Sequence, residues 1–127
     1  MKSGVLAVAL GVMAIVLTGA TSEMTVAEFL KIVKKAESMG PAAILSSDVR
    51  ALRAESERVR QLYIADIAKQ KKAGGARHSC PPAHDRPKMT GEELRVYLSG
   101  LSPAAQKQPF RVAVYDLMKK KYPCKQG

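Results

Sequence analysis

The first twenty residues limit what the rest of the chain can be. Lys2 precedes an apolar run without charge from Gly4 to Leu17, and the small residues Thr18, Gly19 and Ala20 follow it directly. A short positive start, an apolar stretch and a small-residue cleavage site are the parts of a secretory signal peptide. An uncleaved membrane anchor is disfavoured, because spanning the hydrocarbon core takes about 20 apolar residues. We predict a signal peptide over residues 1–20, cleaved after Ala20, and one exported domain over residues 21–127.

The chain has two cysteines, Cys80 and Cys124. An even number of cysteines in an exported protein predicts a disulfide, which ties the end of the chain to its middle. The alternative is a metal site, because His78 and His84 flank Cys80. The two close ligand pairs of common zinc sites are absent, so we predict no metal.

The formal net charge of the whole chain is +10, and it becomes +9 once Lys2 leaves with the signal peptide. Export argues against nucleic acid as the partner of this charge. An acidic protein, an anionic envelope polymer or a lipid headgroup fits better. The alternative is that the positive charge only keeps the surface soluble.

Apolar residues recur at helical spacing in four parts of the exported domain. Two of these parts begin with a capping-box pattern, Thr25 to Glu28 and Thr90 to Glu93. No alternating run is long enough to indicate a strand. We predict an all-α fold, a small bundle of four main helices closed by one disulfide. The helices are expected from Val26 to the Gly40-Pro41 break, from a cap at Ser47 or Asp48 to about Ala73, from Gly91 to Gly100, and from Pro109 to Lys121.

The residues between these helices are expected to form connections. An irregular turn is predicted over residues 42–47. Residues 74–88 carry three prolines and both histidines, and we predict a long loop tethered at Cys80.

Patterns that would indicate catalysis are weak. With both cysteines paired, no thiolate nucleophile remains, and no serine lies in a nucleophile elbow. His78, His84 and Asp85 could meet as a base and its orienting group, but loop histidines are more often solvated. We predict no catalytic residue and no cofactor.

Candidate binding residues are of three kinds. Arg53 and Arg60 belong to the arginine-rich side of the second helix, and His78 and His84 belong to the long loop. Tyr115 falls off the apolar stripe of the last helix, so we expect it to be exposed. Tyr and Arg are residue types that anchor interfaces. The alternatives are an ordinary solvated helix face and an ordinary surface tyrosine.

The C-terminal half carries a sparse pattern between its two cysteines, made of Cys80-Pro81, Leu94, Tyr97-Leu98, Ser102-Pro103-Ala104, Ala113, Leu117 and Tyr122-Pro123-Cys124. In order and spacing this pattern resembles the Rap/Tai-type immunity proteins of type VI secretion. The resemblance covers Cys80 to Cys124 and implies a small helical periplasmic protein that binds and neutralises a cell-wall-degrading effector, such as a secreted amidase. A homodimer stays open, and the short apolar run at the start predicts no stable membrane insertion. Two other functions remain, an acid-resistance-type envelope chaperone and a protein bound to peptidoglycan or lipopolysaccharide.

Overall fold

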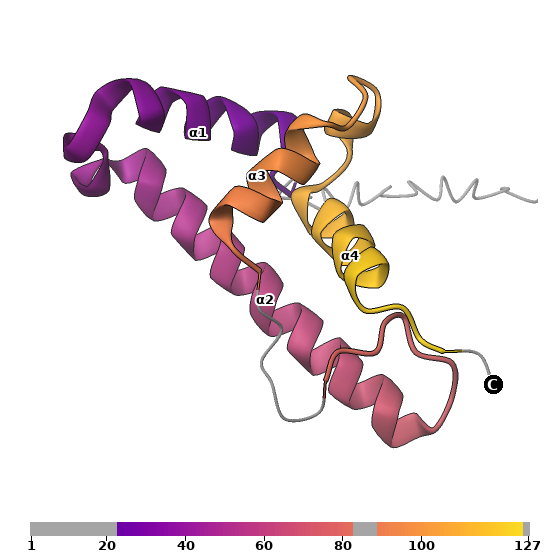
Figure 1. Cartoon of the computed structure of the whole chain (residues 1–127). Helices are drawn as coiled ribbons and strands as arrows, with labels where there is room; N and C mark the ends of the chain where they lie inside the picture. Colours follow the sequence, from indigo (N-terminus) through magenta and orange to yellow (C-terminus); the bar gives the residue numbers. More distant parts are fainter. Residues whose placement is uncertain (1–22, 83–88, 126–127) are drawn as a thin grey trace, which may run out of the picture.

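The structure is a computed structural model that describes residues 23–82 and 89–125 (Figure 1). The predicted signal peptide, residues 1–20, lies outside the described residues. Within them, the regular structure is helical, apart from a single antiparallel bridge between Thr25 and Pro109. The prediction of an all-α fold with four main helices and one disulfide is confirmed. The elements are α1 (Val26–Met39), the 3₁₀ helix η1 (Gly40–Leu45), α2 (Ser47–Ala73), α3 (Gly91–Ser99), the 3₁₀ helix η2 (Ala105–Lys107) and α4 (Phe110–Lys121).

The starts of α1 and α3 follow the predicted capping boxes, fully at α1 and in part at α3. The start of α2 differs from its prediction, because the capping hydroxyl is that of Ser46 and not of Ser47 or Asp48. At α1 the Thr25 hydroxyl accepts from the Glu28 backbone N–H at 3.2 Å, and the Glu28 carboxylate accepts from the Thr25 N–H at 2.7 Å. At α3 the Thr90 hydroxyl accepts from the Glu93 N–H at 3.0 Å. The Glu93 carboxylate instead accepts from the Lys121 ammonium on α4 at 2.8 Å. The second capping box is therefore only half formed, because its acid joins two helices.

The core lies where all four helices meet. Phe29 of α1 stacks on Phe110 of α4, with ring centroids 4.2 Å apart. Backbone hydrogen bonds fix the start of α1 beside the start of α4, from Phe110 N–H to Met24 C=O at 2.8 Å and from Val26 N–H to Gln108 C=O at 3.0 Å. The buried cluster comprises Val26, Phe29, Val59, Tyr63, Leu98, Phe110, Ala113, Val114 and Met118.

The long helix α2 runs from one end of the molecule to the other (Figure 1). At one end α1 and α2 meet at η1 and diverge from it (Figure 1). At the other end the chain leaves α2 at Gly74, which has a φ of 72° and lets the backbone turn away. The disulfide lies at this second end. No described helix is both long and apolar enough to cross a membrane.

Candidate functional site

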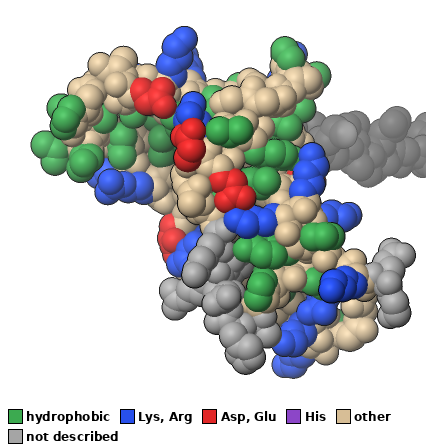
Figure 2. Space-filling model, viewed as in Figure 1, with side chains coloured by type: hydrophobic (Ala, Val, Ile, Leu, Met, Phe, Trp, Pro, Cys, Tyr) green, Lys and Arg blue, Asp and Glu red, His purple; other side chains and the backbone are tan. Residues whose placement is uncertain are grey.

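An apolar corner joins α1 to α2 and protrudes from one end of the molecule (Figures 1 and 2). We define the corner as residues 39–45, which comprise Met39 and η1. Leu45 is 81% exposed, Ile44 is 60% exposed and Met39 is 42% exposed. Large apolar side chains gathered on an exposed surface mark interaction sites more often than single ones do. The corner is the strongest candidate contact surface among the described residues.

Local backbone chemistry holds the corner in shape. Gly40 has a φ of 65°, a value that L side chains rarely adopt, so α1 stops there. Pro41 occupies the first turn of η1, where its missing N–H costs nothing. Ser46 closes the turn, because its hydroxyl donates to Ala43 C=O at 2.7 Å and accepts from the Val49 N–H at 3.2 Å. The exposed apolar side chains therefore lie on an ordered turn.

Sequence reasoning missed the corner as a binding surface. It predicted a brief irregular turn, whereas the structure has a six-residue 3₁₀ helix. A usable signal was present, since no charged residue occurs from Ser38 to Ser47 in a chain that is 25% charged. A turn exposed to water is normally polar, so an uncharged apolar turn is unusual.

Arg53 and Arg60 lie on the exposed side of α2, seven residues apart and thus on one helix face. The Arg60 guanidinium donates to both carboxylate oxygens of Glu57, at 2.8 Å from Nε and 2.7 Å from Nη2. This hydrogen bonding, together with the negative charge of Glu57, raises the pKa of Arg60 above its ordinary value. The face runs from the corner end of α2 toward a pocket.

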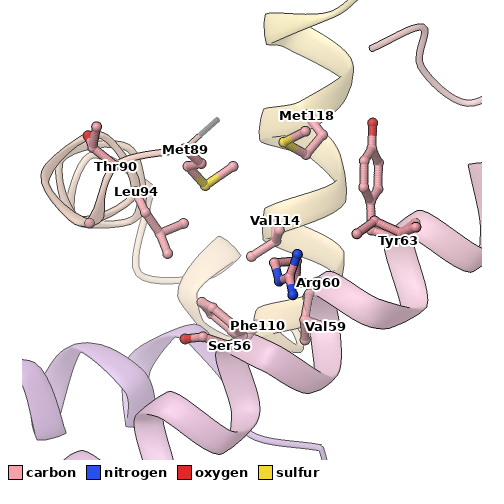
Figure 3. A pocket seen from close by; sticks show the side chains of 12 residues that line it. Ser56, Val59, Arg60, Tyr63, Met89, Thr90, Leu94, Phe110, Val114 and Met118 are labelled. Carbon is pink, nitrogen blue, oxygen red and sulfur yellow. The ribbon is translucent and has the colours of Figure 1, made fainter. Parts of the chain in front are cut away.

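The pocket lies between α2, α3 and α4 and has a volume of about 270 Å³ (Figure 3). Arg60 lines the pocket, together with the apolar side chains of Leu94, Val114 and Met118. A pocket of this size and lining suits one apolar side chain of a partner more than a whole cofactor. The twelve lining residues are Ser56, Val59, Arg60, Tyr63, Ile64, Met89, Thr90, Gly91, Leu94, Phe110, Val114 and Met118.

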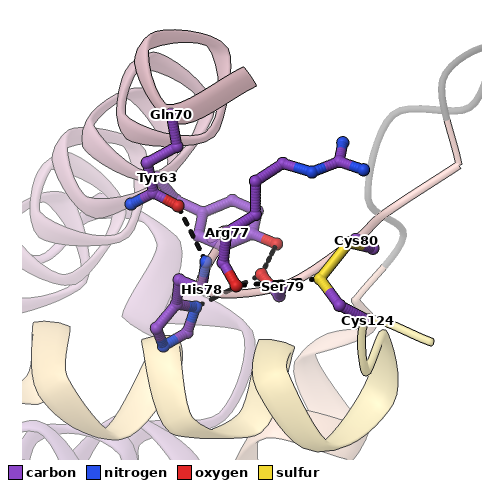
Figure 4. The surroundings of a disulfide bond; sticks show 7 residues. All are labelled: Tyr63, Gln70, Arg77, His78, Ser79, Cys80 and Cys124. Atoms are coloured by element: carbon purple, nitrogen blue, oxygen red, sulfur yellow. Dashed lines mark hydrogen bonds between the residues drawn. A yellow bond between two sulfur atoms is a disulfide. The ribbon is translucent and has the colours of Figure 1, made fainter. Parts of the chain in front are cut away.

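The loop after α2 is fixed by the predicted disulfide between Cys80 and Cys124, whose Cα atoms are 4.9 Å apart (Figure 4). Ser79 is fully buried beside it. The Ser79 hydroxyl is 2.6 Å from the Tyr63 hydroxyl and 3.2 Å from His78 Nδ1. Burial raises the pKa of Tyr63, and the bond to Ser79 partly offsets this. Every hydroxyl of this cluster already has a partner, so the cluster holds the loop on α2.

His78 has a structural role in the same loop. Its backbone N–H donates to Gln70 Oε1 at 2.8 Å, and its ring lies 5.5 Å from the Tyr115 ring. His78 is half-buried rather than solvated. The second predicted loop histidine, His84, lies outside the described residues, so the predicted loop contact there stays a prediction.

Tyr115 differs from the sequence-based expectation of exposure. It is half-buried, and its hydroxyl donates to Asp66 Oδ2 on α2 at 2.6 Å. Its ring packs edge-on against Tyr63, with centroids 5.5 Å apart, and the Arg111 guanidinium lies 5.7 Å from its centroid. Burial, and then the bond to Asp66, raise the pKa of Tyr115 well above its usual range. The residue is off the central stripe because it joins α4 to α2, and that role was wrongly interpreted as exposure.

Within residues 23–82 and 89–125, no group of three or more His, Cys, Asp or Glu side chains is arranged to hold a metal ion. What the described surface offers is contact: an ordered apolar corner, an arginine-bearing helix face and an apolar pocket. Comparisons of the chain with protein-family models, with curated proteins and with solved structures found no match.

Proposed function

We propose that this chain is an exported, non-catalytic binding protein of the immunity type, which acts in the periplasm by occluding the cleft of a cell-wall-degrading effector. The observation that supports this proposal best is the apolar corner. It is convex, it protrudes, and it is held in shape by Gly40, Pro41 and Ser46. A projection of this kind can fill a concave cleft.

The energetics of such a contact favour the corner as its centre. Burying a large apolar side chain contributes about 1.5–3 kcal/mol relative to leaving it in water. Leu45 and Ile44 are mostly exposed in the free protein, so most of this gain remains for binding. Because the turn is already ordered, less conformational entropy is lost on docking than for a flexible loop.

The arginine face suits the rim of the same contact. Arg53 and Arg60 are exposed on α2, on the helix that leads away from the corner. Rim charges mainly speed encounter with a partner of opposite charge. We therefore expect the effector to carry an acidic surface beside its cleft. His78 and Tyr115 would contribute indirectly, by holding the loop and α4 on α2.

The test first asks whether a gene beside this one encodes a cell-wall amidase, and then measures inhibition of that enzyme by the release of dye-labelled peptidoglycan. Leu45→Asp places a charge in the centre of the proposed contact and should raise the concentration needed for half inhibition at least about 100-fold. Val96→Asp is the matched control, because Val96 of α3 is also apolar and 59% exposed. This control should inhibit like the wild type.

Two results would contradict the proposal. Equal inhibition by the Leu45 and Val96 variants would remove the corner from the interface. Failure of the wild-type protein to inhibit the neighbouring amidase would argue against the immunity function. Circular dichroism of each variant checks that the helices are intact.

One observation favours a second candidate, an acid-resistance-type chaperone. Three ion pairs join separate segments of the described structure, and acid weakens ion pairs with carboxylates in general. These pairs are Lys35–Asp48, Lys121–Glu93 and Arg111–Glu23. An acid titration with a fluorescent hydrophobic probe separates the two candidates. A chaperone should loosen and bind the probe at low pH, whereas an occluding inhibitor should stay folded.

A further inference from the structure

Positive side chains collect at the end of the molecule opposite the corner. We call this surface the basic end, and no described carboxylate forms an ion pair with any of its members. By contrast, Asp48, Glu55 and Glu57 near the other end each pair with a cation. The exposed Asp116 precedes Lys119 by three residues on α4. The basic end comprises Lys69, Lys71 and Lys72 at the end of α2, Arg77 in the loop, Lys119 at the end of α4 and Lys125 beyond it.

Tertiary structure brings these cations together from distant parts of the chain. The disulfide joins the loop after α2 to the segment after α4. The Cys80 backbone N–H also donates to Tyr122 C=O at 2.8 Å. Figure 2 shows Lys and Arg side chains gathered over this lower part of the molecule. The fold therefore holds the positive charges at one end, although charge repulsion would separate them.

A hollow in the basic end combines charge with apolar surface. It has a volume of about 230 Å³, and Lys71 and Arg77 line it. The apolar side chains of Ile64, Ile67, Pro81 and Pro82 line it too. An anionic group bound between the two cations would thus have hydrocarbon contacts beside it.

We propose that the basic end docks this protein on the surface of an anionic phospholipid bilayer, with a headgroup phosphate between Lys71 and Arg77. Five of the six cations are lysines, which act as point charges and suit a diffuse anionic surface. The apolar lining of the hollow favours a lipid over an acidic protein surface. Interfacial binding grows with both cation number and buried apolar area.

This docking leaves the corner free. The 27 residues of α2 extend over about 40 Å at 1.5 Å per residue, so the corner and the basic end lie far apart. A molecule held by its basic end would present the corner away from the bilayer. The inference does not depend on the proposed inhibition, because vesicle binding is measured without an effector.

The experiment is co-sedimentation of the disulfide-bonded mature protein with phosphatidylcholine vesicles that contain about 30% phosphatidylglycerol, an amount chosen to give an anionic surface. One variant removes four charges from the basic end, with Lys69→Gln, Lys71→Gln, Lys72→Gln and Arg77→Gln. The matched control removes four exposed charges elsewhere, with Lys31→Gln, Lys34→Gln, Arg50→Gln and Lys107→Gln. Both variants have the same net charge.

We expect the wild type to bind anionic vesicles, to dissociate from them in high salt and not to bind vesicles of pure phosphatidylcholine. Each cation near an anionic bilayer raises the partition coefficient by up to about fivefold, so the loss of four cations lowers it by no more than about 600-fold. We expect the partition coefficient of the basic-end variant to fall by about 50-fold or more, and that of the control by less than about threefold. An equal loss of vesicle binding in both variants would overturn the proposal, because it would show that binding depends only on the net charge of the protein. Binding of polyglutamate without binding of vesicles would overturn it in favour of an acidic protein.

Discussion

Removing the disulfide with Cys80→Ser and Cys124→Ser tests whether the cross-link holds the two halves of the domain together. The two cysteines are 44 residues apart in sequence. In the chain-entropy model, opening a loop of that length costs about 4 kcal/mol, because the unfolded chain gains freedom. A domain of this size has a total stability of about 5–15 kcal/mol, so the loss is a large share. The melting temperature should fall by roughly 15–30 °C.

The assay is urea unfolding followed by circular dichroism, with the oxidised wild type beside the double variant. The variant should keep its helices at neutral pH without urea, because the Phe29–Phe110 stack lies in the core and not at the disulfide. Its m-value should rise, since an unfolded chain without the cross-link exposes more surface. Wild-type protein treated with a reductant is the control and should behave like the variant. A stability loss below about 1 kcal/mol would refute this reasoning.

Three further predictions concern single contacts. Phe110→Ala should destabilise the domain by about 3–5 kcal/mol in urea unfolding, because it empties a fully buried site; a loss under 1 kcal/mol would place Phe110 outside the core. Tyr63→Phe removes one partner of the buried Ser79 hydroxyl and should cost about 1–3 kcal/mol, and an unchanged midpoint would mean that this bond does not form in solution. The bond to Lys121 lowers the pKa of Glu93 in the folded protein. The bond therefore stabilises the fold above the pKa that Glu93 has in the unfolded chain, and this stabilisation is lost as pH falls through the pKa of Glu93 in the folded protein. Glu93→Gln should therefore be less stable at pH 7 and lose less stability between about pH 5 and pH 3, whereas a pH profile parallel to the wild type would contradict this.

Much of the fold could be predicted because its signals are local. The apolar spacing of Phe29, Val59 and Phe110 reflects the helical period, and a cap such as Thr25 to Glu28 acts within four residues. The end of α2 at Gly74 follows from a residue that tolerates positive φ, whereas its start is capped by Ser46 and not by the predicted Ser47 or Asp48. The disulfide followed from an even cysteine count in a chain with a predicted signal peptide.

The candidate site was harder to predict because it depends on exposure. Leu45 and Ile44 look like core residues in the sequence, and only the path of η1 leaves them in water. Tyr115 shows the reverse error, since its hydroxyl partner Asp66 is 49 residues away. The apolar spacing along one helix shows which face is buried, but it cannot show which neighbouring helix covers a side chain at the edge of that face.

The sequence by itself determined which segments become α-helices, where they stop and which cysteines are available for pairing, because periodicity, caps and glycine turns act over a few residues. Only the tertiary structure decided the partners of single side chains. It turned Glu93 from its own cap toward Lys121, 28 residues away, and brought Arg111 to Glu23, 88 residues away. It also placed the apolar corner and the basic end at opposite ends of α2. These features depend on how the helices pack, and contacts between distant segments leave no periodic trace in the chain.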